Sequence, residues 1–413
     1  MSSPDAARPV RRLLFTGLAA GLGVLLLEVA LQAVTALVPA AANLLQVKTA
    51  GRSEDPRRIP DERLGERPNP RWHAHDSRGF RNPKMLESAS VVALGDSQTF
   101  GTGVEREEAW PLVLGESLGE PVYNMGFPGY SPTQCLLLLE EALELKPRVV
   151  VAAMYAGNDL YDAYRFVHVL GLGADLGAPD AAAQAAIAAA EAERTLEDLV
   201  MTAYANRRRG LRGVLSRHCR IYAMLRTSSR VLGGGAEAAK RTAGPPTWEG
   251  QLARAAKRPG RFEAFESGTF RTLFTPRYRA LAVRMEDPRI REGERLCLAA
   301  LARMHGIARE AGAEFAVLLI PTKELVFAEL AKEGDAVGDT YRRLVEDEST
   351  LWSDVRTELD GLGITFVDGT EALRAALDAG EQPYPIDHDG HPNPAGQRAL
   401  ASAVLEVVSR GDD

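Results

Sequence analysis

Short apolar runs alternate with amphipathic segments in the first third of the chain. Three runs predict buried strands: SVVALGD (90–96), PVYNMGF (121–127) and PRVVVAAMYAGND (147–159). The segments between them, REEAWPLVLGESLG (106–119) and SPTQCLLLLEEALEL (131–145), predict helices, with Ser131 as N-cap before Pro132. The third run is continuously apolar, which is typical of a parallel strand covered on both faces.

The same alternation returns in the last third of the chain. The pattern predicts a helix, a strand, a helix, a strand and two closing helices, at 293–312, 314–321, 349–359, 363–370, 371–380 and 392–410. Five strands that alternate with helices predict an α/β fold with a doubly wound, flavodoxin-like, parallel five-stranded sheet.

Regularity lapses between these stretches, at about residues 160–290. This region contains an Ala-rich helical segment (178–200), a basic amphipathic segment (207–230) and a Gly-rich connector (231–246). We interpret it as a mostly helical insertion in one large domain that covers residues 89–409. The basic segment either touches a membrane surface or is a solvated face packed beside acidic residues.

The N-terminus carries a long apolar run, Leu13 to Leu45, behind Arg8, Arg11 and Arg12. Its length is sufficient to span a bilayer, and the basic cluster favours a cytoplasmic N-terminus. We therefore expect residues 1–45 to be a single-pass membrane anchor, with the domain at 89–409 on the extracytoplasmic (periplasmic) side. A cleaved signal peptide is the alternative, since VPAAA (38–42) offers small residues for cleavage.

Two further features belong to this end of the chain. Glu28 lies inside the apolar run, either paired with a partner membrane protein or tolerated as a lone acid. Residues 46–88 are rich in Arg, Asp, Glu and Pro without periodicity, and we expect a linker. Its last part, HDSRGFRNP (75–83), is expected to dock on the core through the apolar Phe80.

Charge and cysteine content exclude some classes of function. The net charge is −7 and no basic stripe dominates, which argues against a nucleic-acid partner. Cys135, Cys219 and Cys297 follow no metal-ligand spacing. They are expected to be ordinary thiols, although Cys219 and Cys297 could pair in an exported chain.

Ser97 is the first candidate for chemistry, because it follows the first predicted strand in Gly-Asp-Ser. Ligands bind at the carboxyl ends of parallel strands, so the position is suitable. A serine hydroxyl is a weak nucleophile, however, and it needs a base, an acid that orients the base, and donors for the oxyanion. Gly, Asp and Ser are ordinary strand-ending residues, so Gly-Asp-Ser alone does not identify a nucleophile.

The loop PIDHDGHPNPAGQ (385–397) offers the base and the acid. It follows the last predicted strand, on the same rim of the sheet as Ser97. Asp389-Gly390-His391 places a carboxylate two residues before an imidazole, close enough to orient the ring in one tight turn. His388 and Asp387 lie beside them, and a polar turn before a helix is the plainer interpretation.

Four blocks of the sequence resemble the SGNH (GDSL-type) hydrolases, in the order known for that family: GDSQTFGTG (95–103), NMGFPGYSP (124–132), AGND (156–159) and DGHPNPAG (389–396). The resemblance implies the SGNH hydrolase fold. It also implies Ser97 as nucleophile and His391 and Asp389 as its partners. The oxyanion donors would be the backbone N–H groups of Ser97 and Gly129 and the side chain of Asn158.

The final block departs from the commonest pattern, which places Asp three residues before His, where this chain has His388. The acid is then Asp389 or Asp387, and we prefer Asp389. A similar Asp-x-His spacing occurs in the alginate O-acetyltransferase-like branch of the family. LLIPTKELVF (318–327) also resembles that branch, in which case Lys323 lines the site; otherwise it is a surface lysine that opens a helix.

These features predict a membrane-anchored serine ester hydrolase that needs no metal or organic cofactor. Its substrate would be an acyl-ester small molecule or an acylated glycan. One alternative is an O-acetyltransferase that modifies envelope polysaccharide. The other is a non-catalytic envelope scaffold that meets a membrane-protein partner through Glu28 and the insertion.

Overall fold

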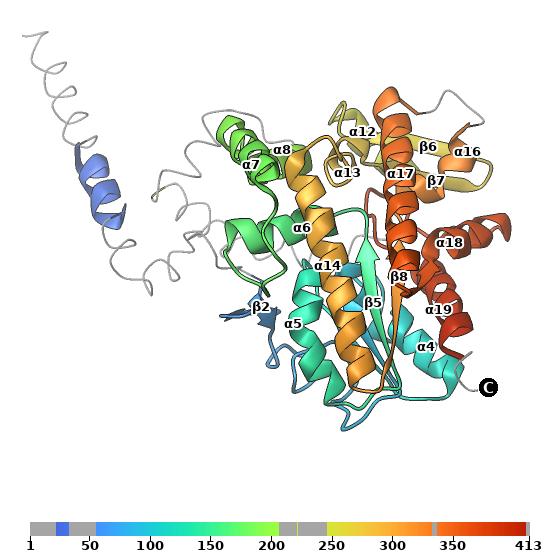
Figure 1. Ribbon diagram of the computed structural model, residues 1–413. Coiled ribbons are helices and arrows are strands. Elements are labelled where there is room, and N and C mark those ends of the chain that lie inside the picture. The colour runs from blue at the N-terminus through green and yellow to red at the C-terminus, as the bar shows by residue number, and fades with distance from the viewer. Residues whose placement is uncertain (1–21, 33–54, 206–220, 222–245, 333–336, 410–413) are drawn as a thin grey trace, which may run out of the picture. The chain divides into compact units, whose positions relative to one another are not determined.

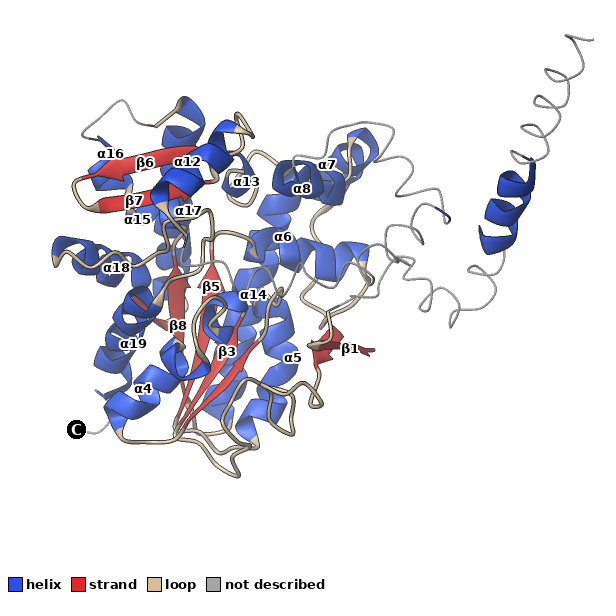
Figure 2. Cartoon of the chain, turned by 180° about the vertical axis from the view of Figure 1, so that it is seen from behind, coloured by secondary structure: helices blue, strands red, loops and turns tan. Residues whose placement is uncertain are grey.

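Five strands form one parallel sheet, and they are β3 (Val91–Gly95), β4 (Val122–Gly126), β5 (Val149–Tyr155), β8 (Glu314–Ile320) and β9 (Thr365–Asp368). Their order across the sheet is β4-β3-β5-β8-β9, and every neighbouring pair is parallel. Figure 2 shows β3, β5 and β8 of this sheet. In chain order this is 2-1-3-4-5, the flavodoxin-like arrangement. The predicted α/β fold with a five-stranded parallel sheet is confirmed.

The computed structural model describes residues 22–32, 55–205, 221, 246–332 and 337–409. The chain divides into two units, one made of residues 1–54 and 207–245, the other of 55–206 and 246–413. The sheet and all elements named with a label belong to the second unit.

Helices cover both faces of the sheet (Figure 1). Val92 and Leu94 of β3 point into a core shared with α5 (Pro132–Leu143), α14 (Pro288–Glu310) and α17 (Asp339–Gly361). Val91 and Ala93 point the other way, into a core shared with α4 (Trp110–Leu118), α18 (Gly369–Asp378) and α19 (Pro394–Val408). Both faces of β3 are buried, which is why its sequence is apolar throughout.

Helix starts follow local capping chemistry. Ser131 forms a capping box with Gln134 at the start of α5, as its position before Pro132 predicted.

The Ala-rich segment forms two helices instead of one, α7 (Ala181–Glu193) and α8 (Leu196–Ala205), which are separated at Arg194. The predicted helix at 349–359 is the second half of α17, which already begins at Asp339.

The insertion is mostly helical, as expected, but it also contains a β-hairpin. Its elements are α6 (Asp159–Tyr164), a π-helical turn (Arg165–Val169), α7, α8, α12 (Trp248–Ala256), the strands β6 (Glu263–Ser267) and β7 (Phe270–Phe274), and α13 (Pro276–Arg279). Phe265 and Phe274 pack against each other and against Phe327, which gives the hairpin a buried face. The basic segment and most of the connector lie outside the described residues.

The linker predicted for residues 46–88 is wrong for residues 55–88, which belong to the sheet-bearing unit. They form an antiparallel hairpin, β1 (Arg58–Asp61) and β2 (Gly65–Pro68), and then pack on the core. The docking of residues 75–83 is confirmed, because Phe80 is fully buried. Buried polar side chains hold this segment, since Tyr123 Oη donates to Asp76 Oδ2 at 2.6 Å. This segment is held by hydrogen bonds and shows no apolar periodicity, so the hydrophobic pattern of the sequence did not predict its packing on the core.

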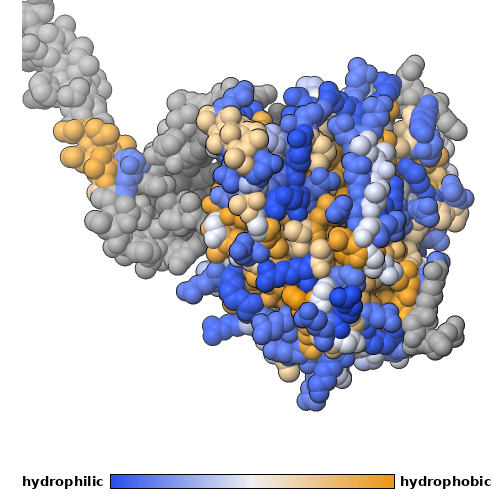
Figure 3. Space-filling view, in the orientation of Figure 1, coloured by the Kyte–Doolittle hydropathy of each residue, from blue (hydrophilic) through white to orange (hydrophobic). Residues whose placement is uncertain are grey.

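The predicted anchor lies largely outside the described residues, which include only 22–32 of it. These residues are helical, with Leu22, Leu25 and Leu27 half exposed or more (Figure 3). Gln32 Nε2 donates to Glu28 Oε1 at 3.0 Å, so Glu28 has a partner within its own helix. None of the helices among the described residues combines the length and the apolar character needed to cross a membrane.

Candidate active site

Ser97 stands at the carboxyl end of β3, as the first residue of the short helix α3 (Ser97–Phe100). The buried Asp96 caps this helix, and its carboxylate accepts the Gln98 N–H at 2.8 Å. Ser97 Oγ lies 3.2 Å from Asp96 Oδ2 and 2.8 Å from His391 Nε2. Burial raises the pKa of Asp96. Asp96 therefore shapes the turn that presents Ser97. The imidazole that contacts the Ser97 hydroxyl belongs to His391, near the other end of the sequence.

His391 connects Ser97 to a carboxylate. Its Nδ1 lies 2.5 Å from Asp389 Oδ1, and its backbone N–H donates to the same oxygen at 3.1 Å. Burial alone would raise the pKa of Asp389, but the hydrogen bonds and charge of His391, together with the charge of Lys323, lower it to about 2. Asp389 is thus ionised at neutral pH and fixes the ring of His391.

The other residues of this loop have different partners. Asp387 Oδ1 accepts the backbone N–H of Asp389 at 2.9 Å, so this carboxylate shapes the turn rather than contacting His391. The ring of His388 packs edge-on against Phe262, with centroids 5.1 Å apart. Burial lowers the pKa of His388. Of the two acids left open by the sequence, Asp389 is the one beside the imidazole.

Lys323 does not line the pocket next to Ser97, and it is not a surface lysine either. It begins α15 (Lys323–Val326) and is 1% exposed. Its Nζ donates to the carbonyl oxygens of Asp387 and Asp389, both at 2.9 Å. Burial lowers the pKa of Lys323 to about 8. Lys323 therefore fixes the backbone of the loop that carries His391.

Gly129 and Asn158 line the same pocket as Ser97. A Cβ at Gly129 would meet only Arg58 Nη2, at 3.9 Å. The requirement for glycine at this position comes from its φ of +85°. Gly126 is needed for packing, because a Cβ there would lie 2.6 Å from Phe100 N.

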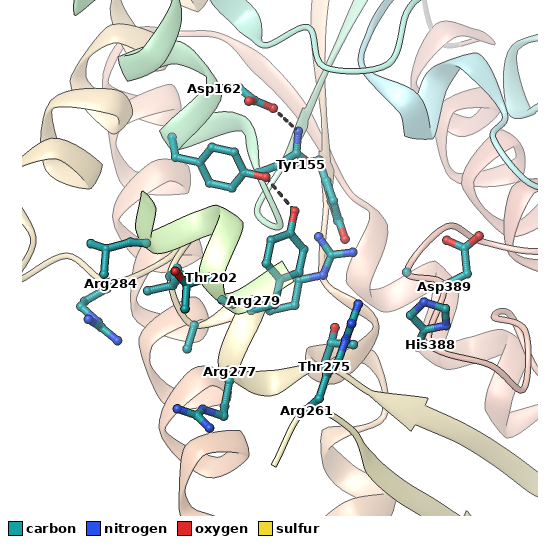
Figure 4. A pocket seen from close by; sticks show the side chains of 18 of the residues that line it. Tyr155, Asp162, Thr202, Arg261, Thr275, Arg277, Arg279, Arg284, His388 and Asp389 are labelled. Atoms are coloured by element: carbon teal, nitrogen blue, oxygen red, sulfur yellow. Dashed lines mark hydrogen bonds between the residues drawn. The ribbon is translucent and has the colours of Figure 1, made fainter. Parts of the chain in front are cut away.

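Asp162 is a site residue that sequence reasoning missed. Asn158 Nδ2 donates to Asp162 Oδ2 at 2.7 Å (Figure 4). Burial raises the pKa of Asp162 to about 7, although the hydrogen bond from Asn158 acts in the opposite direction. An acid four residues after Asn158 on a helix was a visible signal, since side chains at this spacing meet. Asp162 orients the amide, and one N–H of Asn158 remains for another acceptor.

Arg58 is a second residue that was missed, because it lies in the supposed linker. Its Nη2 donates to the carbonyl of Pro128 at 2.6 Å, and its Nη1 pairs with Glu66 at 3.1 Å. The guanidinium also lies over the ring of Phe127, 4.7 Å from its centroid. The β1–β2 hairpin thereby holds the turn that contains Gly129.

The pocket around Ser97 has a volume of about 930 Å³. The insertion supplies much of its wall, from α8, the segment before β6, and α13 (Figure 4). Cys135 and Cys297 are buried free thiols, while Cys219 lies outside the described residues. Across the described ranges, no three or more His, Cys, Asp or Glu side chains are grouped to hold a metal ion.

The end of β3 and the loop between α18 and α19 bring a serine, an imidazole and a carboxylate into hydrogen-bonding distance, an arrangement typical of serine hydrolases. Residues 93–288 match the model of the GDSL-like lipase/acylhydrolase family. The protein is accordingly a hydrolase that acts on ester bonds. The match includes Ser97, Gly129 and Asn158 and ends before Asp389 and His391.

Comparison with solved structures finds similar chains of low identity. The phospholipase A1 of Streptomyces albidoflavus is 14% identical with a TM-score of 0.36, over 78% of this chain and 99% of that one. A GDSL-like lipase from Bacteroides thetaiotaomicron is 11% identical with a TM-score of 0.32, over 78% and 88%. The extracellular lipase of Streptomyces rimosus is 12% identical with a TM-score of 0.34, over 78% and 98%.

The family assignment rests on the sequence match alone, because TM-scores at this level are too low to carry it. No curated protein matches the chain. The match is to the family as a whole, so the resemblance to its alginate O-acetyltransferase-like branch stays a prediction.

Proposed function

We propose that the protein hydrolyses acyl esters with Ser97 as nucleophile, His391 as general base and Asp389 as the orienting acid. The observation that carries this proposal is the continuous series from Ser97 Oγ to His391 Nε2 (2.8 Å) and from His391 Nδ1 to Asp389 (2.5 Å). Both distances are within hydrogen-bonding reach, which proton transfer from the hydroxyl requires.

The reaction proceeds in two halves. Ser97 Oγ attacks the ester carbonyl while His391 Nε2 takes its proton, and the same nitrogen then protonates the leaving alcohol. Water attacks the acyl-enzyme, His391 takes a proton from this water, and the carboxylic acid leaves as Ser97 regains its hydrogen.

The oxyanion of each tetrahedral intermediate is stabilised by donors on three strand ends. We assign these donors to the backbone N–H groups of Ser97 and Gly129 and to the second side-chain N–H of Asn158. Ser97, Gly129 and Asn158 all line the pocket, which supports this assignment. Removal of one such donor typically costs about 10²–10³ in kcat.

The direct test uses 4-nitrophenyl acetate and a fluorophosphonate probe on wild type, Ser97→Ala and Ser117→Ala. Ser117 is an exposed helical serine whose hydroxyl donates to Val113 O, so it serves as the matched control. We expect Ser97→Ala to lose hydrolysis and labelling and Ser117→Ala to keep both. A wild-type protein that neither hydrolyses the ester nor reacts with the probe would support the scaffold alternative.

Acyl transfer and hydrolysis differ only in the acceptor of the second half-reaction. Offering wild type an acetyl ester together with a polysaccharide, and measuring acetate against acetylated glycan, separates the two. Excess transfer to the glycan would replace hydrolysis by the O-acetyltransferase alternative.

We also propose that residues 13–45 anchor the protein in a membrane with the catalytic domain outside the cytoplasm. The apolar run and the exposed Leu22, Leu25 and Leu27 support an apolar surrounding for this segment. Protease treatment of intact spheroplasts should digest the domain from outside. Protection of the domain until the membrane is broken would overturn this orientation.

A further inference from the structure

The wall of the pocket around Ser97 is rich in arginine. Among the described residues that line it, six are arginines: Arg58, Arg194, Arg261, Arg277, Arg279 and Arg284. Figure 4 shows several of them on different sides of the pocket. The chain as a whole has a net charge of −7, so its overall composition does not explain why arginines are concentrated at this site.

The acids of the pocket do not balance this charge. Three aspartates line it. Asp389 is engaged with His391, and Asp387 accepts the N–H of Asp389. The pKa of Asp162 is raised to about 7 by burial, so part of this group is neutral at physiological pH. Arginines therefore outnumber aspartates among the residues that line the pocket, although Arg58 is paired with Glu66 outside this set.

Arg279 is the most unusual of the arginines. It is 8% exposed, yet no carboxylate of the described residues forms an ion pair with it. Its Nη1 donates to Gly157 O at 3.1 Å, while its Nε is buried with no partner among the described residues. Glu324 contributes an attractive charge but bonds to Thr275 instead. Burial alone would lower the pKa of Arg279, but the neighbouring Tyr155, Tyr278 and Glu324 raise it, so the guanidinium stays cationic. A buried cation with an unused N–H and no carboxylate bonded to it can accept an external anion.

Arg279 also lies next to the reacting groups. Gly157, its hydrogen-bond partner, immediately precedes Asn158. On the other side, a Cβ built on Gly390 would collide with Arg279 Nη2, and Gly390 immediately precedes His391. The rings of Tyr155 and Tyr278 support the guanidinium, with centroids 5.4 and 5.0 Å from Cζ (Figure 4). The cation is thus held between the segment that carries Asn158 and the segment that carries His391.

We propose that the pocket selects acyl esters whose alcohol portion carries an anionic group, and that Arg279 binds this group. The inference rests on the proposed function, in which His391 protonates the leaving alcohol. The alcohol portion must then lie on the His391 side, where Arg279 is. Carboxylate, sulfonate and phosphate share the chemistry that a guanidinium recognises. The exposed Arg277 and Arg284 attract the anion at longer range.

The experiment compares 4-acetoxybenzoate with its neutral methyl ester, methyl 4-acetoxybenzoate, as substrates of the full chain. 4-Acetoxybenzenesulfonate and 4-acetoxyphenyl phosphate extend the set, and their relative kcat/KM distinguishes carboxylate from the other anions. We expect wild type to prefer an anionic ester at least tenfold, mainly through KM, and to lose much of this preference at high salt.

Three variants identify the arginine responsible. Arg279→Met should lower kcat/KM for the anionic ester to the level of the neutral ester, while Arg279→Lys should keep part of the preference. Because Arg279→Met could perturb the loop at Gly157, the exposed pair Arg277→Met/Arg284→Met provides a second measurement. It should weaken the salt dependence of kcat/KM for the anionic ester.

The outcomes separate this inference from the proposed function. Equal rates on charged and neutral esters would overturn the inference and leave the esterase intact. The inference also fails if Arg279→Met slows both esters equally, because the arginine would then be structural. If no ester is hydrolysed and the fluorophosphonate does not label Ser97, both this inference and the proposed function fail.

Discussion

Asp389 and Asp387 are two residues apart, and only the first contacts the imidazole. Asp389 shares a hydrogen bond with His391 Nδ1, whereas Asp387 accepts a backbone N–H. We predict that Asp389→Ala lowers kcat on 4-nitrophenyl acetate by about a thousandfold, because the ring loses its orienting charge. Asp387→Ala should cost less than tenfold. Steady-state kinetics on both variants checks this, and the reverse ranking would assign the acid to Asp387.

Asp162 positions Asn158 through a single hydrogen bond of 2.7 Å. We predict that Asp162→Ala lowers kcat about tenfold with little change in KM, because the amide loses the acceptor that holds it toward the oxyanion. Asp162→Asn keeps an oxygen acceptor and should restore most of the activity. If Asp162→Asn is as impaired as Asp162→Ala, the charge rather than the hydrogen bond of Asp162 matters.

At the scale of elements, the β1–β2 hairpin supports the oxyanion turn from outside the sheet. Arg58 reaches from β1 to the carbonyl of Pro128, next to Gly129. We predict that Arg58→Ala lowers kcat on the neutral 4-nitrophenyl acetate about tenfold, because this turn loosens. Arg57→Ala is the matched control, since Arg57 pairs with Asp55. Equal rates for the two variants would limit the hairpin to a structural role.

The elements themselves could largely be predicted from local pattern. β3, β4, β5, β8 and β9 each lie within a predicted strand. β3, β4 and β5 are buried at every residue, and continuous apolar runs are typical of such strands. The hairpin at 58–68 could not be predicted, since one of its anchors is the hydrogen bond that Arg58 donates to the distant carbonyl of Pro128. Such contacts leave no periodicity in the sequence.

At the scale of the whole molecule, a fully buried carboxyl group joins α17 to the end of β8. Glu348 accepts hydrogen bonds from Thr322 N at 2.7 Å and from Trp352 Nε1 at 3.3 Å. Burial raises the pKa of Glu348 from 4.5 to about 7. The folded state therefore holds a proton that the unfolded state has lost, and this group makes the protein less stable as pH rises from about 4.5 to 7.

We predict that Glu348→Gln removes this dependence. Above pH 7 the variant should be more stable than wild type, by at most about 3 kcal/mol for a pKa rise from 4.5 to about 7. At pH 5 the advantage should disappear, because Glu348 is then protonated in the folded state. Thermal unfolding of both proteins at pH 5 and pH 8 checks this. The exposed Glu346→Gln is the control, and an equal effect of it at pH 8 would contradict the assignment to Glu348.

The sequence by itself determined the alternation of strands and helices, the parallel sheet, and the four blocks that contain Ser97, Gly129, Asn158 and Asp389 with His391. These are local properties, since burial period, capping and motif spacing act over a few residues. Only the tertiary structure decided between Asp389 and Asp387 as the partner of His391. It also placed Lys323 against the backbone of the loop at 387–389, and Arg58 and Arg279 at the pocket. Each of these outcomes depends on contacts between residues far apart in the chain, which local pattern does not encode.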